Sequence, residues 1–264
     1  MVIKQGKWLG KKKNLVGTLL FSLMLILEFG WNEAIAKNKW SHLKPLYGGL
    51  VGSVVIGLDG TLYSISSGGP YKSMDGGLTW SSAVGNASTF GFRIFAVHPT
   101  IPGVVYAVTD KGLAKSIDSG VTWNFIGSGF PTQEGVTSLV IDHRNPSILY
   151  VSTSGLGAKG ILKSTDSGET WVQKNNGLQS LHIGHINVDP NIPNKVVAVS
   201  WRGHFYISEN GGESWTATQG MWGNVIGIAP SDSNIIYVTH DGDWWSPSGR
   251  YPLLKSTDGG SGAI

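Results

Sequence analysis

The sequence contains no cysteine, few charged residues and no long amphipathic pattern after its N-terminal segment. Without cysteine, the chain can form no disulfide and carries no thiol chemistry. Charged residues make up 14% of the 264 residues, and after residue 36 fifteen basic residues balance fifteen acidic ones. This balance excludes the basic surface typical of nucleic-acid-binding domains. Glycine is abundant at 38 residues, which favours short strands joined by tight turns over helices.

The first 36 residues have the layout of a secretory signal peptide. Five lysines between Lys4 and Lys13 precede an apolar run over residues 15–27, and Ala34 and Ala36 offer small residues for cleavage. As a helix, this run would reach only ~20 Å, short of the ~30 Å hydrocarbon core of a bilayer. We therefore expect a secreted or periplasmic protein that meets a membrane only through this segment. The long gap before Ala36 keeps a retained anchor as an alternative.

One pattern, S-x-D-x-G-x-T-W, recurs through the rest of the chain, and we call each copy a box. Copies occupy residues 73–80, 116–123, 164–171 and 208–215, and a fifth copy begins at Ser256 but lacks the final Thr-Trp. The central positions lie 43, 48, 44 and 48 residues apart, which indicates a repeat architecture. We assign a structural role to the shared positions, which are Ser73, Asp75, Gly77, Trp80, Ser116, Asp118, Gly120, Trp123, Ser164, Asp166, Gly168, Trp171, Ser208, Asn210, Gly212, Trp215, Ser256 and Asp258.

The box has the chemistry of a tight turn between two strands. Short Ser and Asp side chains accept hydrogen bonds from nearby backbone N–H groups, and Gly supplies left-handed backbone geometry. Thr begins the next strand, and Trp buries a large ring beside it. Two apolar alternations precede each box, as in residues 139–142 and 148–151, and a third strand leads into it. Each repeat of ~45 residues thus contains four short strands, the content of one propeller blade.

The box resembles the Asp-box (BNR) repeat, from about Leu50 onward. The resemblance implies an all-β protein, a β-propeller of four-stranded blades, with each box between the third and fourth strands. We place the five repeats at about residues 50–83, 93–127, 136–174, 183–218 and 223–264. In the degenerate first repeat, residues 54–63 predict a hairpin with a tight Asp59-Gly60 turn. Residues 40–43 look like a fourth strand that could close a five-bladed ring, but the broken fifth box favours an incomplete propeller.

Strand alternation places all the boxes on one face of such a propeller. Function is therefore expected on the opposite face, where loops vary on a rigid scaffold. Aromatic rings beside carboxylates would suit a sugar there, although the plainer interpretation is that the rings pack between blades. We predict ligand binding by Trp201, Arg202, Trp222, Trp244, Trp245 and Tyr251.

Glycoside hydrolysis is the enzymatic alternative. Residues 105–113 are similar to a segment of the xyloglucanase-type Asp-box hydrolases, and this resemblance implies a catalytic role for Asp110. Acid–base hydrolysis needs two carboxylates, and the family's second one lies in a domain that this chain lacks. Asp241 or Asp243 would have to supply it. Sialidases, a less favoured alternative, need clustered arginines, whereas here the arginines after the leader occupy different places in their repeats: Arg93, Arg144, Arg202 and Arg250.

Binding without chemistry is the interpretation that we favour. The repeat pattern also resembles sortilin-type receptor propellers and photosystem II stability/assembly factors, which implies protein partners. His182 and His185 would face opposite sides of a strand, and residues 241–243 lack the rest of a calcium loop, so we expect no metal and no cofactor. We predict an exported scaffold that binds a polysaccharide, an oligosaccharide or a protein. Assembly of a membrane protein complex is a further alternative.

Overall fold

The computed structural model describes residues 51–66, 69–86, 91–131, 135–201, 203–219, 223–240 and 253–261. The predicted signal segment and residues 40–43 lie outside these ranges. The described part contains strands and turns and no helix, so it has no helix long and apolar enough to cross a membrane. The strands form five antiparallel sheets, each built from consecutive strands, and the prediction of an all-β propeller is confirmed.

We number the sheets as blades 1 to 5 along the chain. Blade 1 contains β1 (Val51–Ile56), β2 (Leu62–Ser66), β3 (Gly69–Ser73) and β4 (Ser81–Ser82), and blade 2 contains β5 (Phe92–Val97), β6 (Val105–Thr109), β7 (Gly112–Ser116) and β8 (Asn124–Ile126). Blade 3 contains β9 (Val136–Ile141), β10 (Leu149–Thr153), β11 (Ile161–Ser164) and β12 (Val172–Gln173). Blade 4 contains β13 (Ile183–Val188), β14 (Val196–Ser200), β15 (His204–Ser208) and β16 (Thr216–Gln219). The described part of blade 5 contains β17 (Gly223–Ile228), β18 (Ile236–His240) and β19 (Leu253–Ser256).

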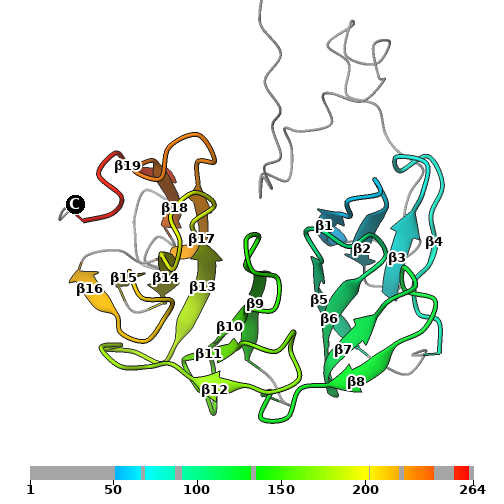
Figure 1. Ribbon diagram of the computed structural model, residues 1–264, viewed down its shortest axis with the longest axis horizontal. Helices are drawn as coiled ribbons and strands as arrows, with labels where there is room; N and C mark the ends of the chain where they lie inside the picture. The colour runs from blue at the N-terminus through cyan, green and yellow to red at the C-terminus, as the bar shows by residue number, and fades with distance from the viewer. Residues whose placement is uncertain are drawn as a thin grey trace, which may run out of the picture.

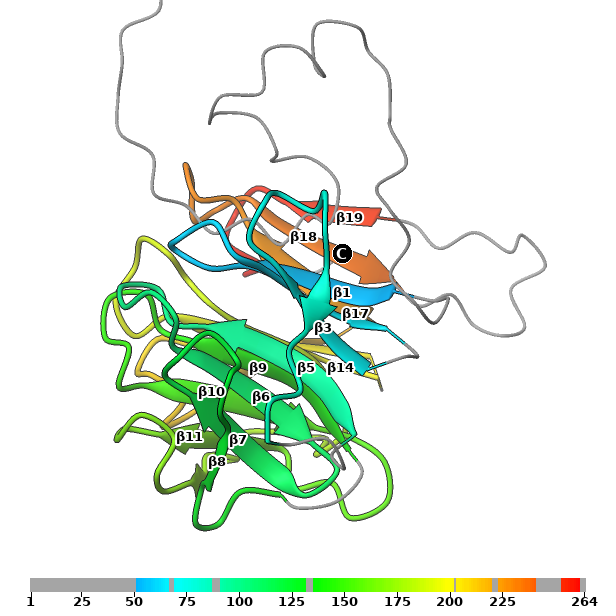
Figure 2. The same cartoon turned by 90° about the vertical axis from the view of Figure 1, so that its right-hand side faces the viewer.

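The blades follow one another around an open arc, with the first strand of each blade toward the inside (Figure 1). The view turned by 90° shows the sheets of blades 2 and 3 lying face to face (Figure 2). Because the strands alternate in direction, the box turns and the turns between strands 1 and 2 share one face, which we call the box face. The turns between strands 2 and 3 and the links between blades share the opposite face, which we call the loop face.

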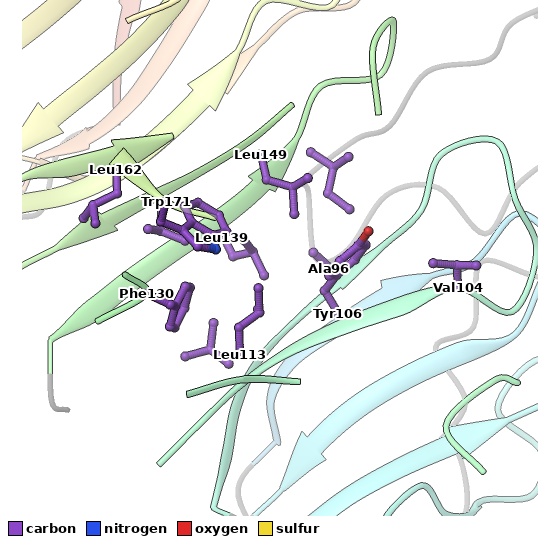
Figure 3. Packing of buried hydrophobic residues seen from close by; sticks show 12 residues of the cluster. Ala96, Val104, Tyr106, Leu113, Phe130, Leu139, Leu149, Leu162 and Trp171 are labelled. Atoms are coloured by element: carbon purple, nitrogen blue, oxygen red, sulfur yellow. The ribbon is translucent and has the colours of Figure 1, made fainter. Parts of the chain in front are cut away.

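Each pair of neighbouring blades encloses its own apolar cluster. Between blades 2 and 3, Tyr106 and Leu113 of one sheet face Leu139, Leu149 and Trp171 of the next (Figure 3). Similar clusters fill the other three interfaces. Burial of apolar area therefore holds the blades together, and the second strands β6, β10 and β14 are buried along their whole length.

Blade 1 departs from this pattern on the side of its sheet that faces away from blade 2. Val54 is 46% exposed, whereas Phe95, Leu139 and Ile186 hold the same position in blades 2, 3 and 4 and are at most 6% exposed. Ile56, two residues further along β1, is 51% exposed. The positions that pack on a preceding blade elsewhere thus remain half-exposed in blade 1, at one end of the arc.

The hairpin predicted in the first repeat is present, but its loop is longer than a two-residue turn. Pairing between β1 and β2 ends at Ile56 and Leu62, which leaves five residues, 57–61, in the loop. The Asp59 carboxylate accepts the Thr61 N–H at 3.0 Å, and Gly60 has a φ of 79°. Asp59 and Gly60 lie within this loop, which is closed by the bond from the Gly57 N–H to the Thr61 carbonyl.

Candidate functional site

The box turns are closed by the side chains that define the motif. In the second box, Ser116 Oγ donates to the Asp118 carboxylate and accepts the Gly120 N–H, both at 2.8 Å. The carboxylate also accepts the Thr122 N–H at 2.8 Å and the Thr122 hydroxyl at 2.6 Å. These bonds to the charged form lower the pKa of Asp118 to about 2. Asp75 and Asp166 have the same partners in their boxes and the same lowered pKa, about 2.

The fourth box shows that the turn does not require a carboxylate. Asn210 accepts from the Ser208 hydroxyl at 2.9 Å and from the Ser214 N–H at 2.9 Å. Its amide Nδ2 donates to Ser214 Oγ at 2.8 Å, which reverses the direction of the bond made by Asp118. An amide of the same shape therefore closes the turn. The box aspartates therefore have a structural role, because their carboxylates are occupied by the hydrogen bonds that close the turn.

The box face also joins neighbouring blades through their tyrosine and lysine side chains. The Gly211 carbonyl in the fourth box accepts Tyr150 Oη at 3.0 Å and Lys163 Nζ at 2.8 Å, both from blade 3. Lys163 Nζ also lies 5.6 Å from the Tyr150 ring centroid. In the same way, Lys72 of blade 1 donates to the Ser119 carbonyl of the second box at 2.7 Å. Tyr150, Lys163 and Lys72 thus join neighbouring blades across the box face.

On the loop face, Asp110 begins the two-residue turn between β6 and β7. Its N–H donates to the Gly91 carbonyl, and its carboxylate accepts the Gly91 N–H, each at 2.9 Å. The side chain therefore fixes the link from blade 1 to blade 2. The other acidic residues that the structure describes lie in the turns of the box face, at the far ends of the strands: Asp59, Asp75, Asp118, Asp142, Asp166, Glu169, Asp189, Glu209, Glu213, Asp232 and Asp258. No described carboxylate can therefore act as a partner for Asp110.

Trp201 holds the same position in blade 4 as Asp110 in blade 2. Its N–H donates to the carbonyl of His182 in the link between blades, at 3.1 Å, and its side chain is 47% exposed. In blade 3 the position is taken by Ser154, which donates to the Gly135 carbonyl. The backbone contact is therefore constant while the side chain varies. The remaining predicted site residues lie outside the described ranges: Arg202, Trp222, Asp241, Asp243, Trp244, Trp245 and Tyr251.

The arginines expected of a sialidase do not come together in the described part. Arg93 lies at the loop-face end of β5, whereas Arg144 lies in the turn between β9 and β10, on the box face. Arg202 and Arg250 fall outside the described ranges. The two described guanidinium groups therefore cannot share one substrate carboxylate.

The sequence reasoning missed the loop between β10 and β11. Leu156 at its tip is fully exposed, and the flanking Gly155 and Gly157 have φ angles of 86° and 79°. The loop is nevertheless braced, because the Lys159 N–H donates to Thr153 Oγ1 at 2.8 Å and the Gly155 N–H to His182 Nδ1 at 3.3 Å. The sequence did carry a signal here, an isolated leucine among three glycines and a lysine on the face expected to be functional.

Leu181 and His182 connect this loop to Trp201. The Leu181 side chain lies against Gly160, where an added Cβ would come within 2.9 Å of Leu181 Cδ2. His182 accepts the Gly155 N–H with its ring and the Trp201 N–H with its carbonyl. We call Leu156, Leu181 and Trp201 the Leu156 patch; their side chains are 101%, 42% and 47% exposed.

The histidines of blade 4 do not assemble a metal site. A bulge between Ile183 and His185 interrupts the regular strand alternation on which the opposite-sides prediction relied. Burial lowers the pKa of His185 to about 4. Among the residues that the structure describes, no group of three histidine, cysteine or acidic side chains could hold a metal ion.

Solved structures with a similar fold are known. No protein-family model and no curated sequence matches the chain. Among solved structures, an ancestral GH74 enzyme shares 20% identity over 82% of this chain, with a TM-score of 0.62. YCF48 bound to D1 peptide shares 16% over 78%, with a TM-score of 0.56. The extracellular domain of a hybrid two-component system from B. thetaiotaomicron shares 16% over 80%, also with a TM-score of 0.56.

The chain spans 30%, 64% and 30% of the lengths of these three structures, in the same order. At such low sequence identities the likeness extends to the architecture and not to the site residues. The chain therefore shares the β-propeller fold with these proteins.

Proposed function

We propose that this chain is an exported Asp-box propeller that binds a glycan or a protein on its loop face. The observation that carries the proposal is the contrast between the faces. The box-face turns repeat one set of side-chain bonds and also expose apolar side chains such as Met74 and Ile117, whereas the loop-face turns differ from blade to blade and expose Trp201 and Leu156 on braced backbone. Contiguous groups of exposed apolar side chains mark interaction sites. The neighbours support a binding role, since one is bound to a peptide and another is an extracellular domain.

Export rests on the N-terminal sequence. Lys4 to Lys13, the apolar run and the small residues at Ala34 and Ala36 have the order of a signal peptide. N-terminal sequencing of the protein recovered outside the cytoplasm should begin at or near residue 37. Recovery of the uncleaved chain in the membrane fraction would instead support the retained anchor.

Binding should be tested with a glycan array and a phage-displayed random peptide library, using Trp201→Ala and Leu78→Ser proteins. Leu78 is 56% exposed and lies in the first box, so its variant controls for loss of any exposed apolar group. We expect a ligand of one class whose affinity falls at least about tenfold in Trp201→Ala and stays unchanged in Leu78→Ser. Ligands that respond only to Leu78→Ser would place the site on the box face and contradict the proposal.

Glycoside hydrolysis remains the second candidate because Asp110 lies on the loop face, at the position that the resemblance implies. Against it, the carboxylate is already bonded to the Gly91 N–H, and no second described carboxylate lies on this face. Asp110→Asn keeps an acceptor for Gly91 and removes the acid. If hydrolysis of β-glucan oligosaccharides occurs and Asp110→Asn abolishes it, the scaffold proposal is replaced by an enzyme.

A further inference from the structure

The loop face and the box face differ in charge. Asp110 is the acid that the structure describes on the loop face, and its carboxylate is bonded to Gly91. Arg93, Lys111 and Lys159 are exposed on the same face. Since the other described acids lie on the box face, the described part of the loop face carries more basic than acidic side chains around its exposed apolar groups. A partner with carboxylates would meet attraction at these basic side chains.

Lys159 brings this charge directly beside the Leu156 patch. It lies three residues after Leu156 in the same loop, and its N–H is held by Thr153. The loop carrying both residues is tied to the link between blades through His182. The loop therefore presents a cation and an apolar side chain together, on a backbone that is already ordered before a partner arrives.

The patch also favours one class of partner. A sugar stacks on a flat aromatic ring, and Trp201 alone offers one here. Leu156 and Leu181 are branched aliphatic groups without hydrogen-bonding atoms, and they gain most by burial against apolar side chains. Their combination with a neighbouring cation suits a polypeptide better than a polar glycan.

We propose that the Leu156 patch docks a polypeptide segment that carries an apolar side chain next to one or more carboxylates. The apolar side chain packs against Leu156 and Leu181, and a carboxylate pairs with Lys159. This inference rests on the proposed function, because it assumes that the loop face is the binding face, and it adds the class of partner.

The test is selection of peptides from a phage-displayed library of random dodecapeptides against the full chain. Selected sequences are made as synthetic peptides and titrated against the wild type, Leu156→Ser, Lys159→Glu and the control Leu78→Ser. All the substituted side chains except Lys159 are exposed leucines, and circular dichroism checks that each variant keeps its strand signal. The same proteins are applied to the glycan array.

We expect enriched peptides that pair leucine, isoleucine or phenylalanine with aspartate or glutamate. Their affinity should fall about tenfold or more in Leu156→Ser and Lys159→Glu, remain unchanged in Leu78→Ser, and weaken as salt is raised. Enrichment of basic peptides, equal binding to Leu156→Ser, or no enrichment at all would overturn the inference. If glycans bind and Trp201→Ala removes them while no peptide is enriched, the inference fails and the proposed function stands. If neither class binds the loop face, both fail.

Discussion

On the box face, the Asp118 carboxylate accepts two bonds from Thr122 and one from Ser116, while on the loop face Asp110 accepts the N–H of Gly91. Both residues sit in short turns between neighbouring strands of the same blade. The first turn recurs with the same bonds at Asp75 and Asp166 and with an amide at Asn210, whereas the second keeps only its backbone bond and exchanges aspartate for serine or tryptophan. Uniform side chains therefore identify the stabilising face of this propeller, and variable ones identify the face available for recognition.

The largest expected difference between the faces concerns two tryptophans. Trp171→Ala removes a ring that is 6% exposed and packs on Phe130 at 5.3 Å between centroids. It should lower the free energy of unfolding by about 3–5 kcal/mol, because it leaves a cavity between blades 2 and 3. Trp201→Ala should change it by less than about 0.5 kcal/mol. Urea unfolding followed by circular dichroism measures both, and comparable losses would break the distinction between the faces.

The next effect concerns the lysines. Lys163→Met removes the bond from Nζ to the Gly211 carbonyl and leaves Glu213 with Lys174 alone. We expect a loss of about 1–2 kcal/mol in the free energy of unfolding, typical of a bond from a charged donor. Lys159→Met, at an exposed position on the loop face, is the matched control and should be neutral. An equal effect of the two variants would mean that the inter-blade bond contributes nothing measurable.

The box carboxylates should make stability depend on acid. Hydrogen bonds lower the pKa of Asp118 to about 2 from its ordinary value of 3.8, so the folded state binds its proton less readily than the unfolded state. Its contribution is complete above pH ~4 and is lost as the pH falls toward 2. Asp118→Asn reproduces the arrangement at Asn210. Between pH 4 and pH 2, the free energy of unfolding of this variant should therefore fall less than that of the wild type. Parallel pH profiles of urea midpoints for the two proteins would contradict this assignment.

The smallest effect sharpens the role of Asp110. Asp110→Ala removes the acceptor of the Gly91 N–H and should cost about 0.5–1 kcal/mol, a low value because the bond is exposed to water. Asp110→Asn keeps an acceptor and should be neutral. Thermal unfolding of the two variants separates them. A larger loss in Asp110→Asn than in Asp110→Ala would show that the charge, and not the acceptor, is what the link requires.

The parts of the fold that could be predicted depend on local chemistry. Each box turn is specified by eight consecutive residues, so the repeat, the strand content and the propeller architecture could be inferred before any contact was known. The bond between Asp110 and Gly91 spans 19 residues. It forms because the link from blade 1 to blade 2 lies beside the turn between β6 and β7. The bracing of the Leu156 loop by His182 spans 27 residues. Neither has a sequence signature, because each depends on the packing of one blade on the next.

The half-exposed side of blade 1 has a consequence for how the molecule behaves at high concentration. The described part of the arc has unlike ends, since one presents Val54 and Ile56 of an inner strand and the other presents β19, with Leu253 56% exposed. Association through unlike surfaces is heterologous, so it adds molecules head to tail and does not stop at a symmetric pair. Copies that meet through these surfaces would therefore form head-to-tail rings or filaments, and analytical ultracentrifugation should show species larger than a symmetric dimer.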